Sequence, residues 1–356
     1  MKIVQLVTQM HLGGAQRVAV LLAEDLRERG YEVEVWFLYL LRPSYNDLPG
    51  VKVLLEHKPS LLEYLKIVVK LWQLLRSHKP DVLITHTHYS NVLGQFLARL
   101  CGVPMRIAVQ HNPLFTYPKL AALADWGLGR TAFYSANVAV SQTVVDSASK
   151  YPGSYITKLK KIYNGIPYLE NKNSPEEVRS YWGLPKNVPL LLNIGRLAHQ
   201  KNQAILLEAL RLLPEAHLLL AGEGELRVFL QKKINELRLE KRVHLLGELK
   251  SQDILALLSI SNVFVFPSLY EAMPMAVVEA MRLGLPVVAS DIPALREVLG
   301  EAGTFVPSDS AEEIARAIQQ ILDSPELASR MRERSLERGS VFSLQTMVDS
   351  YEAILT

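Results

Sequence analysis

Residues 267–281 read PSLYEAMPMAVVEAM, between an apolar, β-rich VFVF and a helix-ending GLP. The pattern predicts a strand, a turn and a helix, with Pro274 near the first helical position, where its missing N–H costs nothing. The free N–H groups of residues 275–277 and the positive end of the helix dipole would then face whatever lies above the turn. This geometry suits an anion, and a phosphate above all.

Two carboxylates flank this predicted anion site, Glu271 in the turn and Glu279 about two helical turns later. Two carboxylates next to a phosphate would repel it, so they must bind another group. Sugar hydroxyls suit them, because an ionised carboxylate accepts two hydrogen bonds from a vicinal diol. One acid could hold a hexose and the other a ribose, as an acidic residue does in dinucleotide sites. A capped surface helix with two solvated acids explains the stretch equally well when it is taken alone.

A longer pattern extends this stretch and resembles a known signature. It runs Ser268-x-Tyr-Glu-Ala-Met-Pro-Met and continues Glu279-Ala-Met-x-x-Gly-x-Pro-Val-Val-Ala-Ser. It is similar to the signature of the retaining glycosyltransferase family 4, the glycosyl transferases group 1. The resemblance implies the glycogen-phosphorylase-like B fold, in which two Rossmann-like, doubly wound α/β domains face a cleft. It also implies a nucleotide-diphosphate sugar as substrate, with UDP favoured over GDP, and no cofactor.

Length and composition limit the class of protein and its compartment. The chain has 356 residues, enough for two domains with full cores, and about half of them are apolar and a fifth charged, as in soluble globular proteins. A single cysteine, Cys101, excludes a disulfide framework and fits a reducing compartment. The first residues read as a strand and not as a signal peptide, and no run of about 18 apolar residues occurs. We therefore expect a cytoplasmic protein that is at most peripheral on the inner face of a membrane.

The first half of the chain alternates strands and helices. Strands are expected at 2–7, 32–38, 81–85, 105–110 and 137–140. Alternation at this spacing predicts a parallel, doubly wound sheet. We expect a first domain over residues 1–167 and a second over 168–340. The resemblance adds that a last helix, at about 341–356, returns to the first domain.

Candidate ligand-binding residues of the first domain follow the predicted strands, because ligands of such sheets bind at the carboxyl ends of the strands. Gly13 and Gly14 follow the first strand, but they lack the GxGxxG spacing of a nicotinamide site. His86 and His88 follow the third strand and His111 the fourth, at spacings unlike those of a zinc site, so we expect no metal. The resemblance implies that the glycine loop reaches toward the donor and that His111 faces the transferred sugar. We assign His86 and His88 to the acceptor pocket; histidines with a structural role are the alternative.

The second half contains another motif, GRLAHQKN at residues 195–202, which resembles the Gly-Arg-x4-Lys element of the family. Its two cations suit a diphosphate, Arg196 as a planar fork and Lys201 as a point charge. Two more glycine turns follow apolar strands, at 221–226 and 246–247, and in the family such turns line the nucleotide base. The predicted donor-binding residues are Gly13, Gly14, Gly195, Arg196, Lys201, Gly222, Gly224, Leu246, Glu271, Met273, Met275, Ala276, Val277 and Glu279. The predicted catalytic residues are His111, Arg196, Lys201 and Glu271.

Two positions depart from the family pattern. Pro167 stands where an aspartate is usual, although a proline suits the entrance to a hinge. Ala272 stands where glycine is common, so the turn would be strained if that position required a positive φ.

The motifs also suggest a mechanism. Many sugar transferases hold a divalent metal with Asp-x-Asp, and this chain contains no such triplet. Arg196, Lys201 and the helix terminus could stabilise the leaving phosphate in its place. The resemblance implies retention of configuration, with Glu271 at the sugar ring and Glu279 at the ribose, in bacterial-type cell-surface glycan, lipopolysaccharide or lipid-linked oligosaccharide synthesis. A nucleotide-sugar epimerase of the same fold and a non-catalytic nucleotide-sugar-binding protein remain alternatives.

Charge is divided unevenly along the chain. Residues 1–167 contain 19 Lys and Arg against 11 Asp and Glu, and residues 168–356 contain 20 against 25. Segment 60–79 is apolar with Lys66 and Lys70 on one stripe, as in a basic helix that lies on an anionic membrane surface. A helix packed on a parallel sheet has the same apolar face, so both interpretations stay open. We expect a glycan or lipid-linked acceptor on the first domain and no nucleic-acid partner. The sequence does not determine an oligomeric state.

Overall fold

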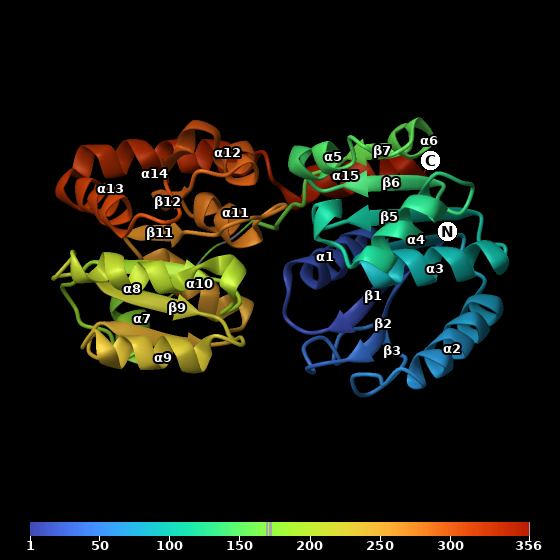
Figure 1. The fold of residues 1–356 in the computed structure, drawn as a ribbon, viewed down its shortest axis with the longest axis horizontal. Helices are drawn as coiled ribbons and strands as arrows, with labels where there is room; N and C mark the ends of the chain where they lie inside the picture. Colours follow the sequence, from blue (N-terminus) through green and yellow to red (C-terminus); the bar gives the residue numbers. More distant parts are fainter. Residues whose placement is uncertain (169, 171–172, 356) are drawn as a thin grey trace. The chain divides into compact units, whose positions relative to one another are not determined.

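The computed structural model describes residues 1–168, 170 and 173–355 (Figure 1). The chain divides into two compact units, each with its own sheet. The N-terminal unit comprises Met1–Ile166 and Leu344–Thr356, and the C-terminal unit comprises Pro167–Ser343. The first limit lies one residue before the expected one, and the second lies three residues after it.

The N-terminal unit is built on a seven-stranded sheet in the order β3-β2-β1-β4-β5-β6-β7, and all its strand pairs are parallel. The order reverses between β1 and β4, the point at which doubly wound sheets bind their ligands. The strands are β1 Lys2–Met10, β2 Glu32–Leu40, β3 Val51–Val53, β4 Val82–His86, β5 Met105–Gln110, β6 Ala136–Ala139 and β7 Leu159–Lys161. The sequence did not predict the edge strands β3 and β7, because three residues are too few to establish a period.

Helices cover both faces of this sheet, and the last helix of the chain is one of them (Figure 1). They are α1 Gly14–Glu28, α2 Glu63–His78, α3 His88–Leu100, α4 Lys119–Gly129, α5 Gln142–Ser147, α6 Gly153–Ile156 and α15 Leu344–Leu355. Arg29, the residue that follows α1, donates to Asp349 of α15 at 2.7 Å and also binds Glu352. The final helix therefore packs on the N-terminal unit, as the resemblance implied.

The C-terminal unit contains a six-stranded parallel sheet in the order β10-β9-β8-β11-β12-β13. Its strands are β8 Leu190–Ile194, β9 His217–Ala221, β10 Val243–Gly247, β11 Val263–Phe266, β12 Val287–Ser290 and β13 Gly303–Val306. Its helices are α7 Pro175–Tyr181, α8 Gln203–Arg211, α9 Arg227–Glu236, α10 Ser251–Ile260, α11 Met275–Arg282, α12 Pro293–Leu299, α13 Ala311–Asp323 and α14 Pro325–Ser340. Both units are thus doubly wound α/β structures, which confirms the predicted fold class.

The interiors of the two units differ in polarity. In the C-terminal unit one large cluster of buried apolar side chains, among them Leu207, Leu220 and Ile314, fills the space between sheet and helices. In the N-terminal unit Gln110 and Asp125 are wholly buried and hydrogen-bonded to each other at 3.1 Å. Over the described ranges, no helix is long and apolar enough to cross a membrane.

Candidate active site

The turn between β11 and α11 begins the site in the C-terminal unit. Pro274 has extended backbone angles and caps α11, so the helix starts at the next residue, Met275. The N–H of Val277 donates to the Pro274 carbonyl at 3.1 Å. This corrects the prediction of three free N–H groups, because the first turn is tightened and Val277 is used within it. The role of Met275 and Ala276 in binding the donor stays a prediction.

Ala272 lies in the same turn without the strain that a positive φ would cause. The described residues other than glycine that have a positive φ are Lys79, Thr87, Asn202 and Arg238. Ala272 is buried with ordinary backbone angles, so the expected conflict with the family glycine does not arise.

An ion pair joins the two motifs of the C-terminal unit. The Lys201 Nζ lies 2.5 Å from Glu271 Oε1, and the two side chains are 18% and 8% exposed. The same ammonium lies 4.8 Å from the centre of the Phe266 ring, the last residue of β11. A charged pair this far removed from water interacts more strongly than a surface pair and fixes both side chains. The structure therefore brings together two predicted catalytic residues.

Hydrogen bonds hold the loop of residues 195–202 against that turn. The Leu269 N–H donates to the Gln200 carbonyl at 2.8 Å, and the Gln200 side-chain amide donates to the Tyr270 carbonyl at 2.7 Å. Asn202, in the left-handed conformation with φ 53°, donates to the Ser308 carbonyl at 2.7 Å. The position of Lys201 is thus determined by backbone contacts on both sides of it.

Arg196 is exposed at the start of this loop, and within the described ranges no side chain pairs with its guanidinium. The loop lies so close to the β9 turn that two glycines are required there. A Cβ on Gly222 would lie 2.0 Å from the Gly195 carbonyl oxygen, and one on Gly224 would lie 2.3 Å from that of Leu197. These predicted glycines therefore allow the close approach of the two loops.

The remaining predicted donor residues lie on neighbouring elements. Glu279 lies on α11 and is buried. Charged side chains are seldom buried unless they are paired or hydrogen-bonded. Met273 is buried in the turn before the helix. Leu246 lies at an irregularity of β10, where the next residue, Gly247, accepts a hydrogen bond from the Gly222 N–H at 2.7 Å. The two glycine turns predicted to line the nucleotide base therefore contact each other.

In the N-terminal unit two predicted histidines are in contact. His86 Nδ1 lies 2.9 Å from His111 Nε2, and His86 Nε2 lies 2.8 Å from Gln5 Oε1. His86 is fully buried. Both its ring nitrogens are engaged, so His86 holds the ring of His111 in place, and its assignment to the acceptor pocket stays a prediction. The sequence analysis missed Gln5, whose only signal is a polar residue inside an apolar strand.

Burial keeps these histidines neutral. It lowers the pKa of His86 well below the ordinary value, with the nearby His111 as the second cause, and it lowers the pKa of His111 to about 3. A neutral imidazole has one donor and one acceptor nitrogen. With the Gln5 oxygen facing His86, the assigned pattern has His86 donating to Gln5 and accepting from His111 Nε2–H. His111 is then left with Nδ1 as an acceptor, which suits a sugar hydroxyl.

The other candidates of this unit lie around the same strand ends. The ring of His88 lies 4.2 Å from that of Tyr89 and 5.0 Å from that of Tyr117, between centroids. Gly13 precedes α1 with an extended backbone, and a Cβ there would lie 2.6 Å from both Gln16 Oε1 and His11 Cε1. Gly14 is the first helical residue. Among the residues that the structure describes, no three metal-binding side chains are grouped to hold a metal ion.

Comparison with known proteins was informative for both units. Residues 174–338 match the family described as glycosyl transferases group 1, and residues 12–168 match glycosyltransferase family 4. An uncharacterized glycosyltransferase of Methanocaldococcus jannaschii is 31% identical over 64% of this chain and 59% of its own length. The Escherichia coli UDP-Gal:alpha-D-GlcNAc-diphosphoundecaprenol alpha-1,3-galactosyltransferase is 30% identical over 65% of this chain and 63% of its own length.

Other relatives match along the whole chain. The lipopolysaccharide core biosynthesis glycosyltransferase LpsE of Rhizobium meliloti is 28% identical over 98% of both chains. The crystal structure of Anabaena HepE in complex with UDP-glucose superposes with a TM-score of 0.88 at 22% identity, over 100% of this chain and 99% of that one. The chain thus spans about three fifths of the first two relatives and nearly all of the others.

Proposed function

Because the chain belongs to the glycosyl transferases group 1 and has the glycosyltransferase B fold, we propose that it transfers a hexosyl group from a nucleotide-diphosphate sugar to an acceptor hydroxyl. The observation that carries the proposal is the Lys201–Glu271 ion pair, together with the exposed Arg196 in the same loop as Lys201. It combines what such a donor needs, cations for a diphosphate and a fixed carboxylate for sugar hydroxyls.

The donor is proposed to bind in the C-terminal unit. Arg196 and Lys201 would bind the diphosphate together with the N–H groups of Met275 and Ala276 at the start of α11. An ammonium has three donors, so Lys201 can keep Glu271 while it binds a phosphate oxygen. The buried Glu279 would accept from the ribose. We favour UDP because Anabaena HepE was crystallised with UDP and with UDP-glucose.

In the proposed reaction the acceptor hydroxyl attacks the anomeric carbon from the face on which the nucleotide leaves. A carbon–oxygen bond to the acceptor forms as the bond to the phosphate oxygen breaks, and the nucleoside diphosphate leaves with the electron pair. The hydroxyl proton passes to the departing phosphate oxygen, and configuration is retained. The developing negative charge would be stabilised by Arg196, Lys201 and the helix terminus, preorganised and without a metal.

The acceptor is proposed to be a glycan or a lipid-linked saccharide bound by the N-terminal unit, at an anionic membrane surface. The E. coli relative is named for a diphosphoundecaprenol-linked acceptor and the R. meliloti relative for lipopolysaccharide core biosynthesis. We place this chain in the same kind of synthesis, with His111 as the candidate of its own unit at the transferred sugar.

Incubation with a panel of UDP- and GDP-hexoses tests the proposal. We expect one UDP-hexose to be hydrolysed slowly without acceptor, with release of UDP and an anomeric product of retained configuration by NMR. Addition of EDTA should not change the rate. Loss of activity in EDTA with recovery in Mg²⁺ or Mn²⁺ would contradict the metal-free mechanism. A product sugar with an inverted ring hydroxyl would show an epimerase, and binding of every donor without turnover would show a non-catalytic protein.

A further inference from the structure

Helix α3 of the N-terminal unit buries polar side chains beside apolar ones: Leu97 and Ala98 belong to the hydrophobic core. It packs on β4 and β5, yet the side chains that it turns inward include Ser90, Asn91 and Gln95, all fully buried. Its outward side chains include Tyr89 and Phe96, both more than two-fifths exposed. A helix that covers a sheet in water normally has apolar residues inside and polar residues outside, so the buried polar side chains and the exposed aromatic ones both need an explanation.

The inward polar side chains are explained by their bonds. Asn91 donates to the Val109 carbonyl at 3.0 Å, and Gln95 donates to the Ile107 carbonyl and to Thr85 Oγ1, both at 2.8 Å. These contacts attach α3 to the strands beneath it. On the opposite face the Phe96 ring stacks on that of Phe133 with centroids 5.5 Å apart, yet Phe96 and Tyr89 stay 41% and 45% exposed.

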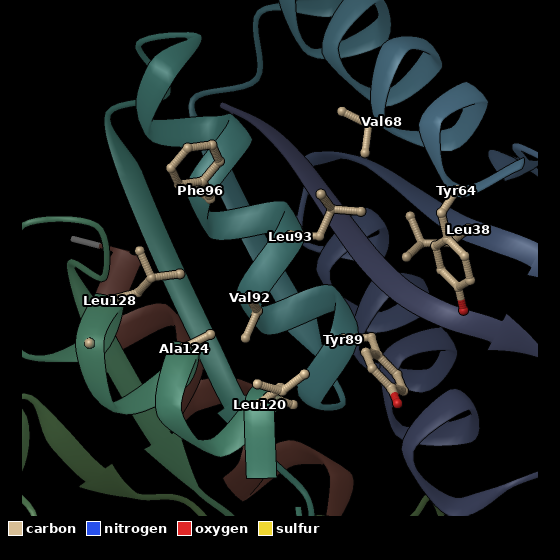
Figure 2. A pocket seen from close by; sticks show the side chains of 12 residues that line it. Leu38, Tyr64, Val68, Tyr89, Val92, Leu93, Phe96, Leu120, Ala124 and Leu128 are labelled. Atoms are coloured by element: carbon tan, nitrogen blue, oxygen red, sulfur yellow. The ribbon is translucent and has the colours of Figure 1, made fainter. Parts of the chain in front are cut away.

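The outward face of α3 forms the floor of an apolar groove with a volume of about 690 Å³, and α2 and α4 form its walls (Figure 2). This volume lies within the range of small-molecule sites, roughly 300–1,000 Å³. The groove is lined by Leu38, Tyr64, Val68, Tyr89, Val92, Leu93, Phe96, Leu120, Ala121, Ala124, Gly127 and Leu128. All but the two tyrosine hydroxyls are apolar side chains, so the groove offers its occupant hydrophobic contact and little hydrogen bonding.

The helices that line the groove carry mainly positive charges, with Lys119 next to the lining residue Leu120 and Arg99 in the last turn of α3, at the end opposite Tyr89. Helices α2, α3 and α4 contain the cations Lys66, Lys70, Arg76, Arg99 and Lys119. Against these five stand only Glu63 and Asp125, and Asp125 is fully buried. An apolar groove among cations is complementary to an amphiphile with a negative headgroup, and less so to a neutral lipid or an acid-poor protein segment.

One end of the groove reaches the strand ends at which the candidate residues lie. Tyr89, which lines the groove, is in ring contact with His88, two residues after the end of β4. His86, the last residue of that strand, is bonded to His111. Figure 2 shows the lining side chains continuing along α3 from Tyr89 to Phe96, away from this end. An occupant could therefore have its headgroup near His88 and its chain along α3.

We propose that this groove binds the hydrocarbon chain of a lipid-linked acceptor whose diphosphate headgroup lies at the His88 end. The inference rests on the acceptor class proposed above and adds the site at which its lipid is held. A single branched chain suits a narrow apolar trough because it buries methylene and methyl groups at about 25 cal/mol per Å² without needing polar partners.

Calorimetry with prenyl diphosphates below their critical micelle concentrations tests this site on the full chain. We expect affinity to rise from inorganic pyrophosphate through geranyl to farnesyl diphosphate. Ala124→Trp, which fills the groove, and Val68→Gln, on the opposite wall, should each weaken farnesyl diphosphate binding by about tenfold or more, the factor that corresponds to losing part of the buried chain. Leu123→Gln is the matched control, because Leu123 lies on α4, is 63% exposed and is not among the lining residues.

Three results would overturn the proposal. Farnesyl diphosphate could bind no tighter than pyrophosphate, or Leu123→Gln could weaken it as much as Ala124→Trp does. Alternatively, the groove variants could leave farnesyl diphosphate binding unchanged and weaken binding to phosphatidylglycerol vesicles, in which case the face docks on a membrane. UDP affinity, measured in parallel, should be the same in all variants. Failure of the wild-type chain to bind UDP would contradict the donor proposal and leave the groove result standing.

Discussion

The two units share one architecture and differ in where they place their polar side chains. In the C-terminal unit an apolar core supports polar groups on the loops after the strands, where Lys201 and Glu271 form their pair. In the N-terminal unit a polar network lies beneath the helices, with Asp125 accepting from Tyr155 at 2.7 Å and from Tyr134 at 2.8 Å. Apolar side chains lie outside, with Leu120 83% exposed.

This difference suits the two kinds of ligand proposed above. A nucleotide-sugar donor needs cations and carboxylates in fixed positions, and a rigid apolar core keeps the loops that contain them in place. The proposed amphiphilic acceptor needs an apolar surface, and α3, which exposes Tyr89 and Phe96, is attached to the sheet partly through the polar bonds of Asn91 and Gln95. Predictions that separate the two units therefore test the whole assignment.

The largest effect should come from the cations of the C-terminal unit. Lys201→Met and Arg196→Ala should each lower kcat by about 10²–10³, the usual cost of losing one donor aimed at the developing charge. Lys232→Met is the control, because Lys232 is a 78% exposed lysine of the same unit. Thermal unfolding should show that all three variants are folded. A loss below tenfold in Lys201→Met, or an equal loss in Lys232→Met, would contradict the role assigned to the pair.

The N-terminal unit should instead respond in stability. Asp125→Ala removes the acceptor of Tyr134, Tyr155 and Gln110, all buried. Each unsatisfied buried donor costs about 1–3 kcal/mol, so we expect a loss of about 3 kcal/mol in the free energy of unfolding. Asn193→Ala is the counterpart in the C-terminal unit, where one side-chain bond, to the Val265 carbonyl at 2.8 Å, is lost. Calorimetry that found Asn193→Ala to be the more costly change would contradict the contrast between the interiors.

The same contrast decides what the sequence could predict. Lys201 and Glu271 lie in motifs with fixed spacing after apolar strands, so their chemistry was predictable, although their direct contact was not, since they are 70 residues apart. Gln5 and Asp125 lie within runs that predict a strand or a helix, and helical periodicity places polar residues outside. Gln5 and Asp125 are buried in spite of this rule because they form hydrogen bonds with residues far away in the sequence. The hydrogen bond of the Val277 N–H was missed for a similar reason, because cap geometry depends on backbone angles that residue types do not fix.

The two carboxylates of the C-terminal unit should separate in their effects. Glu271→Gln keeps the shape of the side chain and loses its charge, and with it the pair with Lys201. It should lower kcat by about tenfold while UDP affinity changes little, since hydrogen bonds to charged groups contribute about 1.5–3 kcal/mol. Glu279→Ala should weaken UDP binding by a similar factor. Calorimetry with UDP and steady-state kinetics separate the two, and equal losses of UDP affinity would contradict the assignment of sugar and ribose.

The last comparison concerns pH, and each unit has a histidine pair with which to make it. In the N-terminal unit His86 and His111 are 2.9 Å apart; in the C-terminal unit His217 and His244 are 3.1 Å apart on β9 and β10. Burial lowers the pKa of all four, to about 3 for His111 and well below the ordinary value for the fully buried His86. His217 and His244 are only half-buried.

A histidine whose pKa is depressed in the folded chain contributes a pH-dependent loss of stability on acidification. Above an unfolded pKa of about 6.5 neither state binds the proton; below it the unfolded chain does and the folded chain does not. The free energy of unfolding should therefore fall as the pH drops below about 6.5, by about 1.4 kcal/mol per pH unit for a fully buried histidine, until the folded pKa is reached.

His86→Gln removes one such group and should make the decline between about pH 6 and pH 4.5 shallower by that slope. His244→Gln, in the half-buried pair, should flatten it less. Urea unfolding across this range measures both slopes, and a His244→Gln effect equal to or larger than that of His86→Gln would contradict the view that the polar interior of the N-terminal unit is the drier of the two.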